Sequence, residues 1–88
     1  MHFVYIIFSP SANIYYKGYS LDPFRRLQQH INKESQFTSK YTDWTLVHLE
    51  VFNSKSDALK REKILKKYAH LQIESLIQSP KNVLSHFL

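Results

Sequence analysis

The stretch His-Phe-Val-Tyr-Ile-Ile-Phe-Ser-Pro-Ser-Ala-Asn-Ile-Tyr-Tyr-Lys-Gly-Tyr, residues 2–19, decides the fold. Residues 2–8 are aromatic and β-branched and contain no Asp, Glu, Lys or Arg, which indicates a strand buried on both faces. Residues 9–13 combine Ser, Pro and Asn, which favour turns, and residues 14–19 again favour a strand. The stretch therefore predicts a β-hairpin.

The hairpin turn sets which side chains face one another. A turn over residues 9–12 predicts that Phe8 faces Asn13 and that Tyr5 faces Tyr16. Directly opposed side chains of an antiparallel pair lie on the same face, so both tyrosines are expected on one face of the sheet.

The rest of the chain alternates helical and extended patterns. The expected elements are a helix from Asp22-Pro23 to near Lys33, a polar loop over 34–44, a strand over 46–52, a helix from a Ser54 cap to about His70, a short helix over 71–78, and an apolar tail over 82–88 that docks on the core. The order is β-β-α-β-α-α. The sequence predicts an α+β fold, with a small three-stranded, mainly antiparallel sheet flanked by helices, in a single domain over residues 1–88.

Composition excludes several classes of protein. The 88 residues contain no Cys, which excludes disulfide scaffolds, thiolate zinc sites and cysteine nucleophiles, and the single Gly excludes Gly-rich nucleotide loops. Neither a membrane span nor a signal peptide is evident, so we expect a cytoplasmic protein. The formal net charge of +5 favours polyanionic partners, nucleic acid first.

Glu62 interrupts the apolar side of its predicted helix. At 100° per residue it falls about 20° from Ala69, inside the arc that Ala58 and Leu65 also occupy. A carboxylate there is costly unless it is paired or binds a cation. Glu62 is therefore a candidate metal ligand or general base; the alternative is an ion pair with Arg61, Lys66 or Arg26.

Arg26 and His30 are four residues apart on the first predicted helix, hence neighbours on one flank, while Arg25 lies on another flank. A permanently charged guanidinium beside an imidazole suits contact with a phosphate. The alternative is a solvated polar face.

The six tyrosines fit core or rim packing, and Tyr5 and Tyr16 are the candidates for catalysis. A catalytic phenol needs a nearby cation to lower its pKa from about 10. His48 and Glu50 alternate along the third predicted strand; an exposed polar face is the favoured interpretation, and a metal-ligand pair is the alternative.

Taken together, these positions resemble the GIY-YIG nuclease superfamily, specifically its small single-domain members, similar to the excinuclease C N-terminal domain and URI-type endonucleases. Phe3-Val4-Tyr5 stands at the family's Gly-Ile-Tyr, and Tyr16-Lys17-Gly18 stands at its Tyr-Ile-Gly. Arg26 and His30 match the family's helix, and Arg61-Glu62-Lys63 matches its Arg-Glu-Lys. The sequence departs from the motifs at Phe3 and Lys17.

The resemblance implies a metal-dependent endonuclease that hydrolyses phosphodiester bonds in DNA, with a role in repair or recombination. It implies Glu62 as the ligand of a single Mg²⁺ or Mn²⁺, Arg26 as a phosphate clamp, Tyr5 or Tyr16 as general base, and His30 as an orienting or relay group. Nucleic-acid contacts are expected at Lys17, Lys40, Lys63 and Asn82, and a protein partner could supply specificity. The alternative is a catalytically weak nucleic-acid-binding or partner-dependent interaction module of the same fold.

Overall fold

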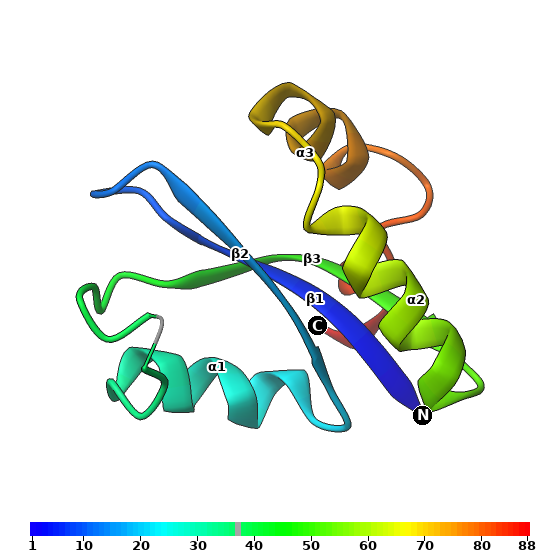
Figure 1. The fold of residues 1–88 in the computed structure, drawn as a ribbon, viewed down its shortest axis with the longest axis horizontal. Helices are drawn as coiled ribbons and strands as arrows, with labels where there is room; N and C mark the ends of the chain where they lie inside the picture. Colours follow the sequence, from blue (N-terminus) through cyan, green and yellow to red (C-terminus); the bar gives the residue numbers. More distant parts are fainter. Residues whose placement is uncertain (37) are drawn as a thin grey trace.

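The computed structural model describes residues 1–36 and 38–88 (Figure 1). Its elements, in chain order, are β1 (His2–Ser9), β2 (Ile14–Ser20), α1 (Pro23–Ile31), β3 (Thr45–Phe52), α2 (Lys55–Leu65), α3 (His70–Ile77) and the 3₁₀ helix η1 (Leu84–Phe87). The predicted α+β class and the order β-β-α-β-α-α are confirmed.

The three strands form one antiparallel sheet in the order β2-β1-β3, so β1 is central and buried on both faces. Helix α1 covers one face, and α2 and α3 cover the other (Figure 1). Two apolar cores result. One lies under α1 and contains Phe3, Tyr5, Ile7, Trp44 and Leu49; the other lies under α2 and α3 and contains Val4, Ile6, Ala58, Leu65, Ile73 and Leu76.

The predicted hairpin is confirmed, but its predicted register is wrong by two residues. Phe8 faces Tyr15 rather than Asn13, and Tyr5 faces Gly18. Asn13 has φ of 55° and belongs to the turn, where its N–H donates to the Ser9 carbonyl at 2.8 Å. Because a shift of two residues preserves the face, Tyr5 and Tyr16 still share one, as diagonal neighbours.

The predicted helix starts are confirmed. The Asp22 carboxylate accepts from the Arg25 N–H at 3.1 Å, with Pro23 in the first turn, and the Ser54 hydroxyl accepts from the Asp57 N–H at 3.1 Å. Helix α1 ends at Ile31, just before Lys33 adopts φ of 63°.

The predicted end of α2 near His70 is wrong: the helix ends at Leu65, and a new helix starts at His70. The Gln72 side chain accepts from the Ala69 N–H at 2.7 Å and caps the start of α3. A straight helix would carry Ile73 about 12 Å along its axis beyond Leu65. The break instead allows Ile73 to join Leu65 in the same core, where both are fully buried.

The remaining segments close the two cores. The described part of the loop over 34–44 contains neither helix nor strand, as expected; Phe37, within it, lies outside the described residues. The tail packs against the core under α1: Leu84 contacts that core, and the Phe87 ring meets Phe3 edge-on, with centroids 5.5 Å apart.

Across residues 1–36 and 38–88, no helix has the length and apolar character to cross a membrane.

Candidate active site

A buried chain of hydrogen bonds joins β1 to α1 and the following loop. The Tyr5 hydroxyl lies 2.9 Å from His30 Nε2, and His30 Nδ1 lies 2.7 Å from Thr38 Oγ1. All three side chains are buried, at no more than 1% exposure. Each ring nitrogen therefore has a hydroxyl partner, so the imidazole plane is held by two elements of the fold. Nothing in the sequence pattern pointed to Thr38, which lies in the polar loop.

Gly18 provides the space for Tyr5. It faces Tyr5 across the hairpin, and a Cβ at this position would overlap the Tyr5 phenol ring and hydroxyl. The glycine is not needed for a left-handed backbone, since no glycine here has positive φ. The phenol of Tyr5 lies across β2, the edge strand, which brings its hydroxyl toward the edge of the sheet.

Tyr16 lies beside this hydrogen-bond chain and is only half-buried. Its ring centroid is 5.0 Å from that of His30 and 6.5 Å from that of Tyr5. The two tyrosines thus differ in access: Tyr5 is 1% exposed and already hydrogen-bonded, whereas Tyr16 reaches the surface.

Arg26 acts to lower the pKa of Tyr5, as expected of a neighbouring cation, but burial outweighs it. Burial, and then the neighbouring Tyr16, raise the pKa of Tyr5 to about 12, although the positive charge of Arg26 opposes the shift. Burial and the positive charge of Arg26 lower the pKa of His30 to about 4. Both groups of the Tyr5–His30 pair are therefore neutral at pH 7.

Arg26 lies one turn before His30 on α1, on the flank that helical spacing predicted. Its Nη1 donates to the Gln29 side chain at 2.8 Å, which orients the guanidinium. The positive charge of Arg26 acts on both groups: it opposes the rise in the pKa of Tyr5 and helps to lower the pKa of His30.

Glu62 extends from α2, on the other side of the sheet, and its side chain is 17% exposed. Of the candidate partners Arg61, Lys66 and Arg26, only Lys66 forms an ion pair with Glu62, with its Nζ 3.8 Å from Oε1. The Lys66 side chain is 58% exposed, so the pair is weak. The negative charge of Glu62 contributes to the raised pKa of Tyr5, after burial and Tyr16, so the carboxylate lies within electrostatic reach of the tyrosine.

The single carboxylate of Glu62 fits a hard divalent cation that takes its other ligands from water and substrate. Among the described residues, no group of three or more His, Cys, Asp or Glu could hold a metal ion. In the same part of the chain, the Glu62 oxygens accept no hydrogen bond from another side chain or backbone group, which leaves them free for a cation. Mg²⁺ commonly binds to one or two carboxylates and completes its shell with water and phosphate oxygens.

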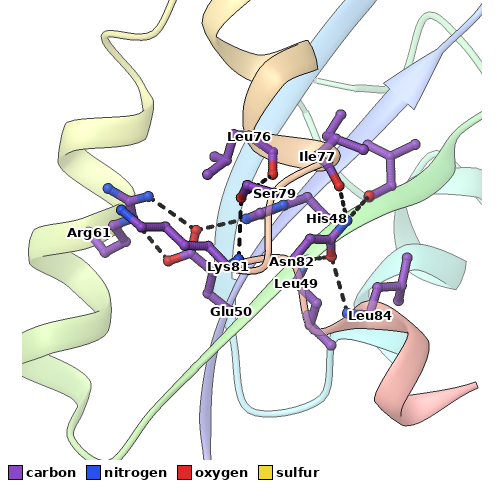
Figure 2. Close-up of polar contacts among 11 residues, drawn as sticks. His48, Leu49, Glu50, Arg61, Leu76, Ile77, Ser79, Lys81, Asn82 and Leu84 are labelled. Atoms are coloured by element: carbon purple, nitrogen blue, oxygen red, sulfur yellow. Dashed lines mark hydrogen bonds and ion pairs between the residues drawn. The ribbon is translucent and has the colours of Figure 1, made fainter.

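The residues expected to contact nucleic acid lie in different surroundings. Lys40 and Lys63 are exposed, and Lys17 is half-buried, with a pKa that burial lowers. Asn82 lies at the far edge of the sheet, beside β3. Its amide oxygen accepts from the N–H groups of Leu49 and Leu84, and its amide nitrogen donates to two carbonyls, those of Val47 and Ile77 (Figure 2). The structure thus does not bring Asn82 together with the tyrosines.

The prediction that His48 and Glu50 form an exposed polar face is wrong. His48 is fully buried and Glu50 is 8% exposed; helix α2 packs against β3, and its Arg61 contacts Glu50. His48 Nε2 lies 2.7 Å from a Glu50 oxygen, and Arg61 donates to both oxygens of that carboxylate, at 3.0 and 3.3 Å (Figure 2). Arg61 thus pairs with Glu50 and not with Glu62. The alternating pattern of β3 and the helix from Ser54 were both visible in the sequence, but the packing of that helix against β3 was not.

Comparisons with known proteins identify the family of this chain. A family model described as the GIY-YIG catalytic domain matches residues 1–71. A UPF0213 protein of Halobacterium salinarum is 40% identical over 77 residues, covering 86% of this chain and 99% of that protein. A UPF0213 protein of Staphylococcus epidermidis is 37% identical over 78 residues, covering 88% and 94%.

A solved structure is also similar. The solution structure of a UPF0213 protein of Bacillus halodurans superimposes with a TM-score of 0.57 at 27% identity, covering 91% of this chain and 85% of that one. The family model spans both tyrosine motifs, the Arg26–His30 helix and Glu62. The chain therefore belongs to the GIY-YIG catalytic domain family, in which the relatives it matches are small UPF0213 proteins.

Proposed function

We propose that this chain is a divalent-metal-dependent endonuclease that hydrolyses phosphodiester bonds in DNA. One observation carries the proposal: Tyr5, Tyr16 and His30 form a packed cluster next to the Arg26 guanidinium, within electrostatic reach of the free carboxylate of Glu62. A cation and phenol groups in one cluster, with a carboxylate within electrostatic reach, match the needs of phosphoryl transfer, in which charge on the phosphate must be stabilised and a water activated.

In this proposal Arg26 binds the scissile phosphate. A guanidinium offers planar, permanently charged donors to the non-bridging oxygens, on which negative charge develops during the reaction. Its hydrogen bond to Gln29 holds the side chain ready before the substrate arrives. The exposed neighbour Arg25 lies about 100° away on the helix and is not part of this clamp.

Tyr16 is assigned as the general base: after its hydroxyl has lost its own proton to solvent, the phenolate takes a proton from the attacking water. It is the half-buried tyrosine of the pair, whereas the Tyr5 hydroxyl is buried and bonded to His30, and burial, with Tyr16, raises its pKa to about 12. The water oxygen forms a bond to phosphorus as the bond to the leaving oxygen breaks, and solvent supplies a proton to that leaving oxygen. Tyr5 and His30 position the Tyr16 ring and keep bulk water from the inner side of the cluster.

Glu62 would hold the divalent ion, Mg²⁺ or Mn²⁺. When bound, such an ion supplies positive charge that stabilises the phosphate and the leaving oxygen. The free oxygens of Glu62 and the loose pair with Lys66 support this assignment. The exposed side chains of Lys40 and Lys63, together with Lys17 and the net charge of +5, favour attraction of the polyanion.

The test is a gel assay with labelled single-stranded, duplex and branched DNA in the presence of Mg²⁺, Mn²⁺ or EDTA. Wild-type protein is expected to cut in a metal-dependent manner. Glu62→Gln and Tyr16→Phe should each lower the cleavage rate by about a hundredfold or more, since a positioned acid–base group typically contributes 10²–10⁴. DNA affinity, measured by fluorescence anisotropy in EDTA, should change little.

Two matched controls separate chemistry from folding. Glu74→Gln removes an exposed carboxylate from α3, and Tyr15→Phe changes the neighbouring tyrosine on the opposite face of β2; both should cut like the wild type. Salt-dependent DNA binding without cleavage in either metal would contradict the enzyme and point to a nucleic-acid-binding module. Cleavage that survives Glu62→Gln would contradict the metal assignment.

A further inference from the structure

The ion pair of Arg61 on α2 with Glu50 on β3 affects Glu62, which follows Arg61 on the helix. We propose that Glu50 and Arg61 form a rotational anchor that sets the position of the Glu62 carboxylate, so that both are positioning residues for the divalent ion. This inference rests on the proposed function, because it concerns the carboxylate assigned to the metal.

Helical geometry places Arg61 and Glu62 on either side of the buried stripe of α2. At 100° per residue, Ala58 and Leu65 lie within about 20° of each other; Arg61 lies about 50° to one side and Glu62 about 50° to the other. Arg61 reaches β3, where it pairs with Glu50 (Figure 2). Glu62 must therefore lie on the side toward β2, since β1 separates the two outer strands.

Apolar packing alone holds the rotation of α2 loosely. Among the described residues of the helix only Ala58 and Leu65 are fully buried, and Ala58 presents a single methyl group. A turn of the helix about its axis would retain much of this burial but would move Glu62 along an arc. Two hydrogen bonds between a planar guanidinium and a carboxylate resist such a turn because both partners are directional.

The anchor is itself held on both sides. His48, fully buried, lies 2.7 Å from one Glu50 oxygen and fixes the carboxylate from within the sheet. Arg61 Cζ lies 5.9 Å from the centre of the Tyr68 ring, which limits the guanidinium from the other side. Such second partners typically affect metal affinity by 10–100-fold even though they do not touch the ion.

The experiment measures Mn²⁺ binding directly, by the electron paramagnetic resonance signal of free Mn²⁺, on the full chain without DNA. Arg61→Lys retains the positive charge but loses the planar guanidinium that donates two hydrogen bonds to Glu50. Glu50→Gln retains the shape of the side chain but loses its negative charge. Each is expected to weaken Mn²⁺ binding by about tenfold. Ile73→Val, a substitution in the same core at an apolar residue that is not part of the anchor, is the control for a general loss of packing and should bind like the wild type.

Cleavage kinetics give a second readout that a direct DNA contact would not reproduce. In both anchor variants the Mn²⁺ concentration for half-maximal activity should rise by about tenfold, while kcat at saturating Mn²⁺ and KM for DNA stay near the wild-type values. A raised KM at saturating Mn²⁺ would instead identify Arg61 as a DNA contact and overturn the proposal. If Arg61→Lys does not fold, Glu50→Gln carries the same comparison.

The failure of this inference is distinguishable from the failure of the proposed function. Mn²⁺ binding lost in Glu62→Gln but unchanged in both anchor variants overturns the anchor alone. Mn²⁺ binding unchanged in Glu62→Gln overturns the metal assignment, and the anchor proposal with it.

Discussion

The two faces of the sheet each bury a polar cluster, and they do so by opposite means. Under α1, Tyr5, His30 and Thr38 are uncharged partners at neutral pH, linked by hydrogen bonds. Under α2, Glu50 and Arg61 form an ion pair.

The difference is visible in the effect of burial on each cluster. Burial raises the pKa of Tyr5 and lowers that of His30, so it removes charge from the first cluster. Burial also pushes the pKa of Glu50 upward, but the hydrogen bond from His48 and the hydrogen bonds and charge of Arg61 outweigh it and hold that pKa below its usual range. Paired charges can remain inside where single ones cannot, and the charged cluster is the one that ties a helix to a strand.

The largest expected effect comes from breaking the ion pair. Arg61→Met leaves the Glu50 carboxylate under α2 without its guanidinium and should lower the free energy of unfolding by about 3 kcal/mol, because an unpaired buried charge is costly. Urea denaturation followed by circular dichroism measures the change. The double variant Glu50→Leu/Arg61→Met should recover most of the loss. A loss below about 1 kcal/mol for Arg61→Met would show that water already screens the pair.

An intermediate effect is expected from filling the space beside the neutral cluster. In Gly18→Ala the new Cβ overlaps the Tyr5 phenol, so we expect a loss of about 1–3 kcal/mol in stability, together with loss of cleavage. A double-mutant cycle with Tyr5→Ala, followed by urea denaturation, tests the cause: the added methyl group should cost much less once the phenol is absent. Equal costs in both backgrounds would assign the effect to the backbone of β2.

The smallest effect is a pH dependence that separates the clusters. Unfolded His30 has a pKa near its ordinary 6.5, whereas burial and Arg26 lower the folded pKa to about 4, so the unfolded chain takes up a proton first. The folded state should therefore lose stability as the pH falls from 6.5 toward 4. His30→Gln should flatten this slope in urea denaturation at pH 7, 6 and 5. An unchanged slope would assign the dependence to another histidine.

The Glu50 pair should respond at lower pH. Because the folded pKa of Glu50 is held below its usual range, its contribution is complete above the ordinary Glu pKa and is lost only as the pH falls through the lower, folded value. Acid should thus weaken the neutral cluster first and the ion pair later.

Local signals in the sequence predicted most of the elements and much of the candidate site. The Asp22 and Ser54 caps, the hairpin apart from its register, and the flank shared by Arg26 and His30 depend on neighbouring residues only, and each was found as expected. The end of α2 was not predicted, because the helical pattern continues past Leu65 and only the need to bring Ile73 back to the core breaks it.

The partners of charged groups could not be predicted in the same way. Periodicity placed Glu62 near the apolar side of α2, and its side chain is indeed mostly buried. It did not identify the partner of Arg61, because a helix and a strand that are adjacent in space carry no mark of their contact in the sequence. Glu50 lies eleven residues from Arg61 and was expected to face solvent.

The sequence by itself determined the strands, the helix starts and the shared face of Tyr5 and Tyr16, because strand alternation and helical spacing are local properties of the backbone. Only the tertiary structure decided that Thr38 forms the second hydrogen bond of the His30 ring and that Tyr5 is buried and remains a phenol. It also decided that Glu50 pairs with Arg61, the residue before Glu62. These features depend on burial and on contacts between distant segments, and both arise only when helices close over the two faces of the sheet.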